Sequence, residues 1–202
     1  MRWPSFALAP GARRFALPPL VAAIPLAVVA PPLAALALAL GVFVIYFFRD
    51  PERTPPPKGV VAPADGRVSV VREEDGRLRV GVFMNVTDVH VLRAPMDGTV
   101  TAATHRPGAH RPAFTKESDR NERVDVTLDT HDVSMIAGWF ARRIHPYIAA
   151  GNGVERGDRI GHIAFGSRAD VLLPPEYDRA DLLVAAGESV RAGETVVALR
   201  TG

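Results

Sequence analysis

A stretch of 34 uncharged, mostly apolar residues, Phe15–Phe48, constrains the fold of this 202-residue chain more than any other feature. As one straight helix it would measure about 50 Å, whereas the hydrocarbon core of a bilayer is about 30 Å thick. Prolines interrupt it at positions 18, 19, 25, 31 and 32, and arginines lie on both sides, at positions 13, 14, 49 and 53. We therefore expect residues 1–48 to anchor the chain in a membrane.

Three arrangements fit this segment. The first is a single tilted span built mainly from Pro32–Phe48, and the second is a re-entrant hairpin that turns at Pro31-Pro32 with both ends in the cytoplasm. Positive residues on both sides favour the hairpin, because cytoplasmic flanks are enriched in Lys and Arg. The third is a cleaved signal peptide with Ala37-Leu38-Ala39 as the cleavage site, but its apolar region would be too long.

Past the apolar segment the pattern changes to that of a β-rich domain. Residues 49–58 contain four prolines, which predicts an extended, semi-rigid linker, and the domain is expected to cover residues 59–202. Short apolar alternations recur at residues 67–72, 78–83 and 123–128, between tight-turn dipeptides such as Asp75-Gly76. These features predict a mainly β, antiparallel domain, in which residues 133–144 are compatible with either helix or strand.

Two weak internal repeats refine that prediction. Val154–Gly161 resembles Val190–Val196 in the pattern V-x-x-G-[DE]-x-[IV], and Ala62–Val68 echoes Ala94–Val100. Such turns occur in lipoyl-like domains, where they join short strands. The predicted fold is thus a compact antiparallel lipoyl-like barrel-sandwich hybrid, preceded by a hydrophobic membrane segment. A fold of this kind assigns no function by itself.

Composition excludes several kinds of chemistry. The chain has no cysteine, which rules out disulfides, thiolate metal sites and cysteine nucleophiles. Two of its 24 basic residues are lysines, and neither Lys58, after three prolines, nor Lys116, in a charged loop, resembles a buried catalytic amine. No H-E-x-x-H, H-x-H or DxD pattern predicts a metal site. The net charge is +2, and no basic run is long enough to indicate nucleic-acid binding.

Six short blocks, read together, resemble a known family. They are Phe48–Arg53, Pro63–Gly66, Phe83–Pro95, Asn121–Arg123, Ala141–Ile144 and Phe165–Arg168. In order and spacing, from about residue 41 to about residue 175, they resemble the short, archaeal-type form of the phosphatidylserine decarboxylase family. No single block is specific, since a Gly-Ser dipeptide alone is typical of an ordinary turn into a strand.

The resemblance implies a self-processing enzyme with a pyruvoyl cofactor. In this family the proenzyme cuts its own chain before a serine, here between Gly166 and Ser167, through an ester; elimination and hydrolysis then leave a pyruvoyl group. The products would be a long chain, 1–166, and a short chain, 167–202, held together as a heterodimer. The resemblance implies no metal and no pyridoxal phosphate, because the pyruvoyl keto group takes the substrate amine and serves as the electron sink.

The resemblance also assigns roles to residues. Ser167 is the nucleophile, His90 matches the family's base, and Asp65 matches the carboxylate that holds the base and stabilises its cation. Gly166 permits a strained backbone at the scissile bond. His90 is again the candidate for protonating the carbanion left by CO2 loss, and Arg93 stands where longer members of the family carry a second histidine.

Three arginines are candidates for binding a substrate carboxylate or phosphate: Arg168, Arg123 and Arg142. Each is open to a simpler interpretation, as one member of a surface or structural ion pair. Of the remaining histidines, His105 and His110 are expected to face solvent, and His131 stands where many relatives have an acidic residue.

The predicted function is decarboxylation of phosphatidylserine to phosphatidylethanolamine, in phospholipid biosynthesis, at the cytoplasmic face of the cell membrane. The expected partners are phosphatidylserine and an anionic membrane surface, and homo-oligomers are compatible with the sequence. Two alternatives belong to other classes: a membrane-anchored lipoyl-like adaptor without catalysis, and a barrel-type metallopeptidase. Within the class, a serine lipid with an ether-linked backbone is the alternative substrate.

Overall fold

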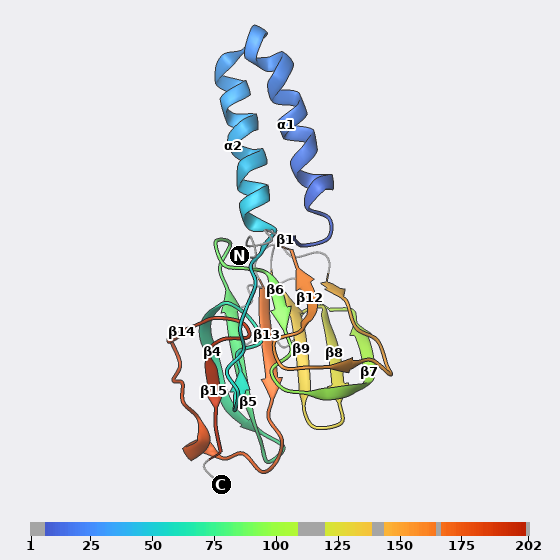
Figure 1. Ribbon diagram of the computed structural model, residues 1–202, viewed down its shortest axis with the longest axis vertical. Coiled ribbons are helices and arrows are strands. Elements are labelled where there is room, and N and C mark those ends of the chain that lie inside the picture. The colour runs from blue at the N-terminus through green and yellow to red at the C-terminus, as the bar shows by residue number, and fades with distance from the viewer. Residues whose placement is uncertain (1–6, 109–119, 139–143, 165–166, 201–202) are drawn as a thin grey trace. The chain divides into compact units, whose positions relative to one another are not determined.

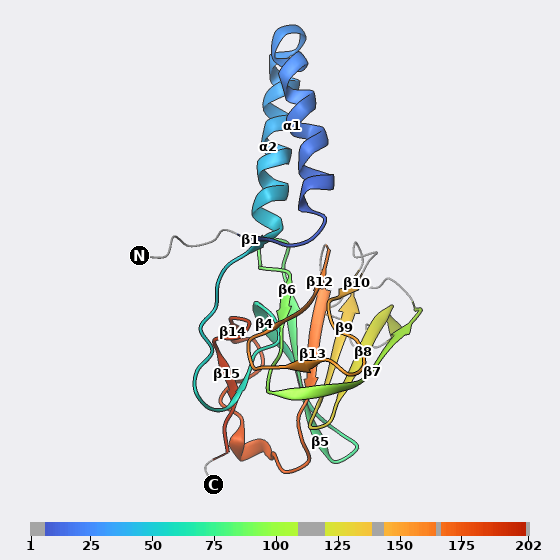
Figure 2. The same ribbon diagram turned by 45° about the vertical axis from the view of Figure 1, so that its right-hand side comes forward.

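The computed structural model describes residues 7–108, 120–138, 144–164 and 167–200 and divides into two compact units, Met1–Glu52 and Arg53–Gly202. The first unit is a helical hairpin (Figures 1 and 2). Helix α1 (Ala12–Val29) and helix α2 (Pro31–Phe47) meet at Ala30, and strands β1 (Ala7–Leu8) and β2 (Arg49–Asp50) pair antiparallel at the open end. Both ends of the apolar segment therefore lie at the same end of the hairpin.

The hairpin keeps its apolar side chains on the outside. Pro31 and Pro32 lie in the first turn of α2, where the missing N–H groups break no helical hydrogen bond. Gly41 faces Leu20, and a side chain at position 41 would overlap that leucine, so the glycine lets the two helices pack closely. Large apolar residues such as Ile24 (72% exposed) and Val28 (85% exposed) face outward. Such a surface suits lipid better than water.

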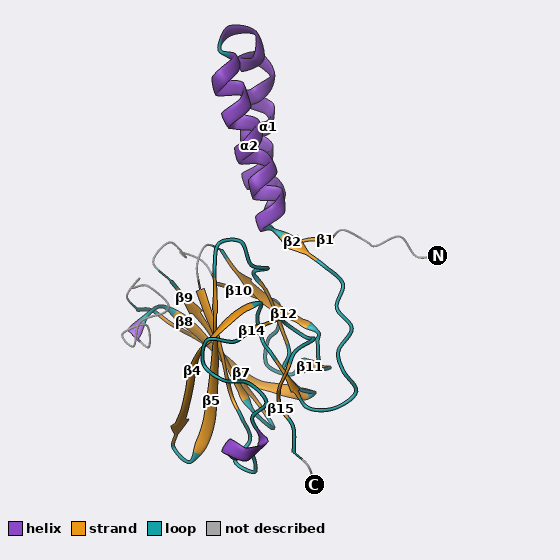
Figure 3. Cartoon of the chain, turned by 90° about the vertical axis from the view of Figure 1, so that its left-hand side faces the viewer, coloured by secondary structure: helices purple, strands orange, loops and turns teal. Residues whose placement is uncertain are grey.

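The second unit is an antiparallel β domain built around an eight-stranded, curled sheet (Figures 1 and 3). The strand order is β11-β7-β8-β9-β13-β5-β4-β14. These strands are β4 (Gly66–Glu74), β5 (Arg77–Met84), β7 (Gly98–Arg106), β8 (Arg123–Leu128), β9 (Asp132–Ala137), β11 (Gly153–Val154), β13 (Ser167–Leu172) and β14 (Ser189–Val190). The prediction of a mainly β domain is confirmed.

Two smaller sheets and one short helix complete the unit. The first sheet has the order β10-β12-β6, and the second pairs β15 with β3. Their strands are β3 (Val60–Val61), β6 (Val91–Arg93), β10 (Ile144–Pro146), β12 (Arg159–Ile163) and β15 (Val196–Ala198), and the 3-10 helix η2 is Arg179–Asp181. The segment that was compatible with helix or strand, residues 133–144, thus covers β9 from its second residue and the first residue of β10.

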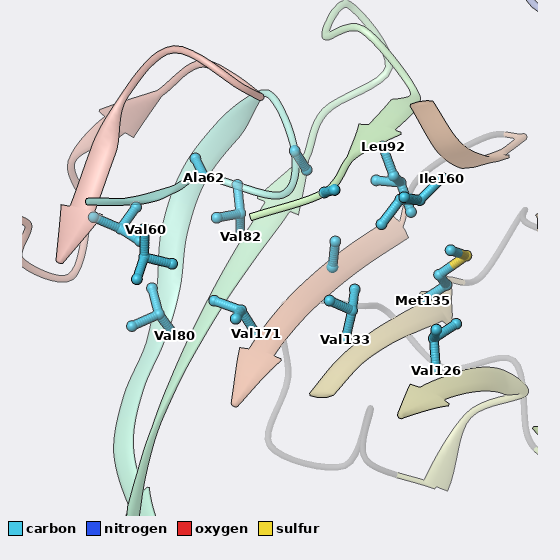
Figure 4. Packing of buried hydrophobic residues seen from close by; sticks show 14 of the residues in the cluster. Val60, Ala62, Val80, Val82, Leu92, Val126, Val133, Met135, Ile160 and Val171 are labelled. Carbon is cyan, nitrogen blue, oxygen red and sulfur yellow. The ribbon is translucent and has the colours of Figure 1, made fainter. Parts of the chain in front are cut away.

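The hydrophobic core lies on one face of the eight-stranded sheet (Figure 4). Because side chains alternate along a strand, Ala169 and Val171 of β13 point into this core, whereas Arg168 and Asp170 point to the other face. Val80, Val82 and Val171 are fully buried, and burial of each such side chain contributes about 1.5–3 kcal/mol.

The two internal repeats form matching structures, which we call the first repeat half (residues 60–68 with 189–198) and the second repeat half (residues 92–100 with 153–162). In the first, Val190 pairs with Gly66, and the Gly193 N–H donates to the Ala62 carbonyl at 2.9 Å. In the second, Val154 pairs with Gly98, and the Gly157 N–H donates to the Ala94 carbonyl, also at 2.9 Å.

Reciprocal hydrogen bonds join the two halves. The Val61 N–H donates to the Pro95 carbonyl and the Arg93 N–H to the Pro63 carbonyl, both at 2.9 Å. The linker is also attached to this framework, because the Arg156 guanidinium donates to the carbonyls of Pro57 (3.0 Å) and Gly59 (2.8 Å). The end of the proline-rich segment, at Pro57, is therefore bound to the second repeat half.

Candidate active site

Ser167 is the first residue of β13, at the centre of the main sheet. It pairs with Met84 of β5 on one side and with Ala137 of β9 on the other. Its side chain is fully buried, and the Oγ lies 3.8 Å from the Met84 sulfur. The predicted cleavage residue Gly166 lies outside the described residues. A hydroxyl in this position is shielded from water and needs a base to become a nucleophile.

His90 is held by a compact turn that follows β5. The Asp88 carboxylate accepts the Asn85 N–H at 2.7 Å, and the Asp88 N–H donates to the Asn85 carbonyl at 2.9 Å. The Asp88 carbonyl in turn lies 2.9 Å from Nδ1 of His90. Because a carbonyl can only accept, Nδ1 carries the hydrogen and Nε2 carries the lone pair. His90 is 3% exposed, so Nε2 is a base inside the protein.

Backbone pairing brings His90 and Ser167 to the same end of the domain. Met84, the residue before the turn, pairs with Ser167, and the His90 carbonyl accepts the N–H of Ile163 at 3.2 Å. The chain on both sides of residues 164–166 therefore runs beside the segment 84–90. This arrangement suits a base acting on the bond that precedes Ser167.

Asp65 lies in the first repeat half and is bound to Arg53. Its oxygens accept two hydrogen bonds from the Arg53 guanidinium, at 2.8 and 3.0 Å, and one from the Ala192 N–H at 2.8 Å. Arg53 also reaches Glu194 at 2.9 Å. Burial raises the pKa of Asp65 and the charge of Asp88 adds to the rise, while Arg53 lowers it. Among the described residues, none of the hydrogen bonds of Asp65 reaches His90.

The candidate arginines are paired and lie away from the Ser167 hydroxyl. The buried guanidinium of Arg168 binds Asp170 through two hydrogen bonds, at 2.8 and 3.0 Å. The Arg123 guanidinium binds Asp125 at 3.1 Å and lines a cleft of about 450 Å³ on the face of the sheet opposite the core. Arg142 lies outside the described residues. The structure therefore does not bring Arg168 or Arg123 together with the side chain of Ser167.

The structure shows the surroundings of two other histidines, His105 and His131. His105 is exposed, as predicted, and its Nε2 lies 2.9 Å from Glu122. His131 is buried, its Nδ1 lies 2.8 Å from the Thr130 hydroxyl, and burial lowers its pKa to about 4. It is therefore a neutral residue of the interior at neutral pH. His110 lies outside the described residues.

Three groups near the site were not predicted from the sequence: the carbonyl of Asp88, the guanidinium of Arg53, and a pair formed by Tyr147 and His162. The Asp88 turn had a signal, because Asn and Asp three residues apart are typical of side-chain-capped turns. Arg53 and Tyr147 had none, since their partners are distant in the sequence.

The described part of the chain contains no group of three His, Asp or Glu side chains placed to hold a metal ion. Helix α1 is long and apolar enough to cross a membrane, and α2 is a slightly shorter apolar helix.

Comparisons with known proteins match the chain to one family model and to relatives with decarboxylase names. The family model described as phosphatidylserine decarboxylase matches residues 40–198. The chain is 56% identical over 186 residues to an archaetidylserine decarboxylase proenzyme, so named, of Halobacterium salinarum, covering 92% of this chain and 95% of that protein. It is 51% identical to a phosphatidylserine decarboxylase proenzyme of Thermobifida fusca, over 81% of this chain and 76% of that one. A protein of the same name from Streptomyces avermitilis is 50% identical, over 79% and 75%.

Proposed function

The chain belongs to the phosphatidylserine decarboxylase family, and on this premise we propose that it cuts itself before Ser167 and removes CO2 from a serine-headgroup phospholipid. The observation that carries the proposal is the family match over residues 40–198, with Ser167 buried at the start of a central strand and His90 held at the same end of the domain. The lipid product keeps an amine where the substrate had an amino acid, as in phosphatidylethanolamine.

The proposed self-cleavage uses His90 as the base. Nε2 of His90 takes the proton of the Ser167 hydroxyl, and the oxygen attacks the carbonyl carbon of Gly166. The bond from this carbon to the Ser167 nitrogen breaks, and the nitrogen leaves with the proton that His90 returns. The Asp88 carbonyl supports this role because it holds the opposite ring nitrogen in its protonated form.

A pyruvoyl group fits the surroundings of Ser167. The strand neighbours at this position, Met84 and Ala137, are buried and apolar, so a small uncharged keto group replaces the serine side chain without leaving a charge unpaired. Strand β13 is bonded to both β5 and β9, which would hold the short chain, 167–202, after cleavage. When formed, the group supplies the carbonyl that captures the substrate amine and takes up electrons from the breaking bond.

We propose that Asp65 acts through charge and position. Its carboxylate is close enough to Asp88 for the two charges to affect each other, and Asp88 supplies the carbonyl that holds His90. A negative charge in this region would stabilise the imidazolium formed during cleavage. Its hydrogen bonds to Arg53 and Ala192 would keep this charge in place.

Substrate binding by arginine is proposed most directly for Arg123. Its side chain is 30% exposed and lines the cleft on the outer face of the sheet, so it is accessible to a lipid phosphate away from the reacting carboxylate, which must approach Ser167 on the other face. Arg168 would have to leave Asp170 to bind a ligand, and Arg142 is retained on the resemblance alone. A rise in KM without a change in kcat on Arg123→Gln would support this assignment, and an unchanged KM would remove it.

We propose that the helical hairpin enters the cytoplasmic leaflet of the cell membrane from one side. Each helix is about 26–27 Å long at 1.5 Å per residue, close to the thickness of the hydrocarbon core. The paired strands β1 and β2 would leave both ends of the hairpin at the same membrane surface. Arg13, Arg14 and Arg49 near those ends fit a cytoplasmic, anionic surface.

The lipid backbone has two candidates. Phosphatidylserine is named for the bacterial relatives, whereas the relative aligned over 95% of its length is named for archaetidylserine. Both lipids present the same serine headgroup. Assays with ester-linked and ether-linked serine lipids of equal chain length would separate the two candidates through kcat/KM.

We also propose kinship with lipoyl-like barrel-sandwich hybrids, on the support of the two matching repeat halves, and we leave homo-oligomerisation as a proposal for sedimentation measurements. The central test of function is incubation of the purified chain with a serine lipid. Release of CO2 by the wild type and not by Ser167→Ala is expected. Equal release by both proteins would exclude the proposed mechanism.

A further inference from the structure

Decarboxylation at this site requires a proton from solvent in every turnover. The bond from the substrate carbon to the carboxylate breaks, CO2 leaves, and the electron pair left behind must finally bind a hydrogen. Ser167 is fully buried and His90 is 3% exposed, so the proton has to cross the protein surface. The acyl shift that cuts the chain makes no such demand, because the Ser167 proton ends on the new amine, whereas the later conversion to pyruvoyl consumes one water once in the life of the protein and not in every turnover.

A cluster of polar side chains extends from the surface to a strand that pairs with the segment after His90. His162 of β12 is 4% exposed, and its Nδ1 lies 2.8 Å from the hydroxyl of the half-buried Tyr147. The ring of the exposed His145 stacks on His162, with ring centres 4.6 Å apart. One end of this cluster is therefore at the solvent and the other inside the domain.

The buried end of the cluster lies beside the proposed base. His162 pairs with Val91, the residue after His90, and the neighbouring Ile163 N–H donates to the His90 carbonyl. Among the described residues, the other buried histidine outside the site is His131, which cannot serve in the same way. It adjoins Asp132, which pairs with Leu172, and Leu172 is five residues, or about 17 Å, along β13 from Ser167.

We propose that Tyr147 and His162 form a proton relay that carries one proton from solvent to the His90 side of the site in each decarboxylation. The inference rests on the proposed function. His162 gives the hydrogen on Nε2 to Nε2 of His90 as Nδ1 of His162 receives the hydroxyl hydrogen of Tyr147. The His90 imidazolium then protonates the carbanion left by CO2 loss, and the Tyr147 oxygen regains a hydrogen from water. The net change is one proton taken from water for each CO2 released.

The charge state of His162 is consistent with this role. Burial, with smaller contributions from the charges of His145 and His90, lowers its pKa to about 4. At neutral pH the ring is therefore uncharged, and a neutral imidazole accepts a proton on one nitrogen while it donates from the other.

The test uses two variants and a matched control. His162→Gln keeps an acceptor for the Tyr147 hydroxyl but cannot relay a proton, and Tyr147→Phe removes the outer member. His105→Gln alters an exposed histidine that is paired with Glu122, and serves as the control. We expect both relay variants to cleave themselves completely and to keep the wild-type KM, while kcat falls about 10²-fold. Added imidazole should restore part of the kcat of Tyr147→Phe, and the control should match the wild type.

A second readout is independent of turnover. Nitrogen-15 NMR of the histidine rings should show His162 with its hydrogen on Nε2 and Nδ1 accepting, and Tyr147→Phe should shift the Nδ1 resonance. Wild-type kcat in Tyr147→Phe, or in a fully cleaved His162→Gln, would overturn the relay. If His162→Gln fails to fold, Tyr147→Phe decides. A wild-type chain that neither cleaves nor releases CO2 would instead refute the proposed function.

Discussion

The two repeat halves of the β domain share a framework but lead to different chemistry at their ends. In each half an aspartate accepts the N–H of the matching turn: Asp65 from Ala192 at 2.8 Å, and Asp97 from Arg156 at 2.7 Å. The second half begins just after His90 and ends just before the residues that precede Ser167, whereas the first begins after the linker and ends at the C-terminus. The repeat thus supplies the architecture, and the attached segments supply the reactive groups.

A second difference concerns the aspartates. Asp65 is largely buried and paired with Arg53, whereas Asp97 is exposed. The turn hydrogen bond is therefore common to both halves, and the ion pair belongs to the first half alone among the described contacts. Substitutions at matched positions can therefore separate effects on the stability of the shared framework from effects on the reaction at Ser167.

The largest expected difference is in the rate of self-cleavage, between variants of His90 and of Lys58. Lys58 precedes the first repeat half by the same number of residues as His90 precedes the second. His90→Gln removes the proposed base, so the rate of self-cleavage should fall by about 10²–10⁴-fold. Lys58→Gln should cleave as the wild type does. Gel analysis of the two chains over time measures both rates. Equal cleavage by both variants would mean that position 90 carries no special chemistry.

The next largest expected difference is in the free energy of unfolding, between Asp65→Asn and Asp97→Asn. The first leaves the Arg53 guanidinium, whose side chain is 8% exposed, with Glu194 as its remaining carboxylate partner, and should lower the free energy of unfolding by about 2–3 kcal/mol. The second keeps an oxygen for the turn N–H at an exposed position and should cost about 1 kcal/mol or less. Urea unfolding of uncleaved Ser167→Ala backgrounds gives both values; similar losses would show that the ion pair adds little to the framework.

Low pH should destabilise the protein through His162 in the second repeat half. The matching residue of the first half, Ala198, does not titrate. Burial lowers the pKa of His162 to about 4 from 6.5, so the unfolded state binds the proton first as the pH falls. The free energy of unfolding is therefore highest above pH 6.5, and protonation of His162 in the unfolded state lowers it progressively toward pH 4, by about 3 kcal/mol in total.

His131 should behave in the same way, so the wild type is expected to lose stability steeply over this range. Urea unfolding between pH 7 and pH 4 measures the loss. It should be smaller by about 3 kcal/mol in His162→Gln than in the wild type. An identical pH dependence in the two proteins would contradict the assignment of His162 as a buried neutral group.

The smallest expected difference is between Gly157→Ala and Gly193→Ala. Both glycines have positive φ, 88° and 72°, so alanine should cost about 1–2 kcal/mol at either position. Gly157→Ala should be the worse of the two, because the added methyl group would also overlap the ring of Pro55 in the linker. Thermal unfolding gives the comparison, and a larger loss for Gly193→Ala would argue against the docked linker.

Much of the fold was predictable from the sequence because short-range sequence patterns determine it. The repeats, the tight turns and the apolar alternation indicated the β domain, and the proline positions indicated a turn near residue 31. The direction of Arg168 was also within reach, since it follows Ser167 in a strand and must point to the opposite face. The contacts of Asp65 were not, because Arg53 and Ala192 meet it only through the fold. The Tyr147–His162 pair depends in the same way on the pairing of β10 with β12.

The most direct test of the account is the intact mass of the purified wild-type protein. We expect two chains, residues 1–166 and a short chain of 36 residues that begins with a pyruvoyl group in place of Ser167. A single mass for the unbroken 202-residue chain, with an amide still joining residues 166 and 167, would contradict the proposed chemistry.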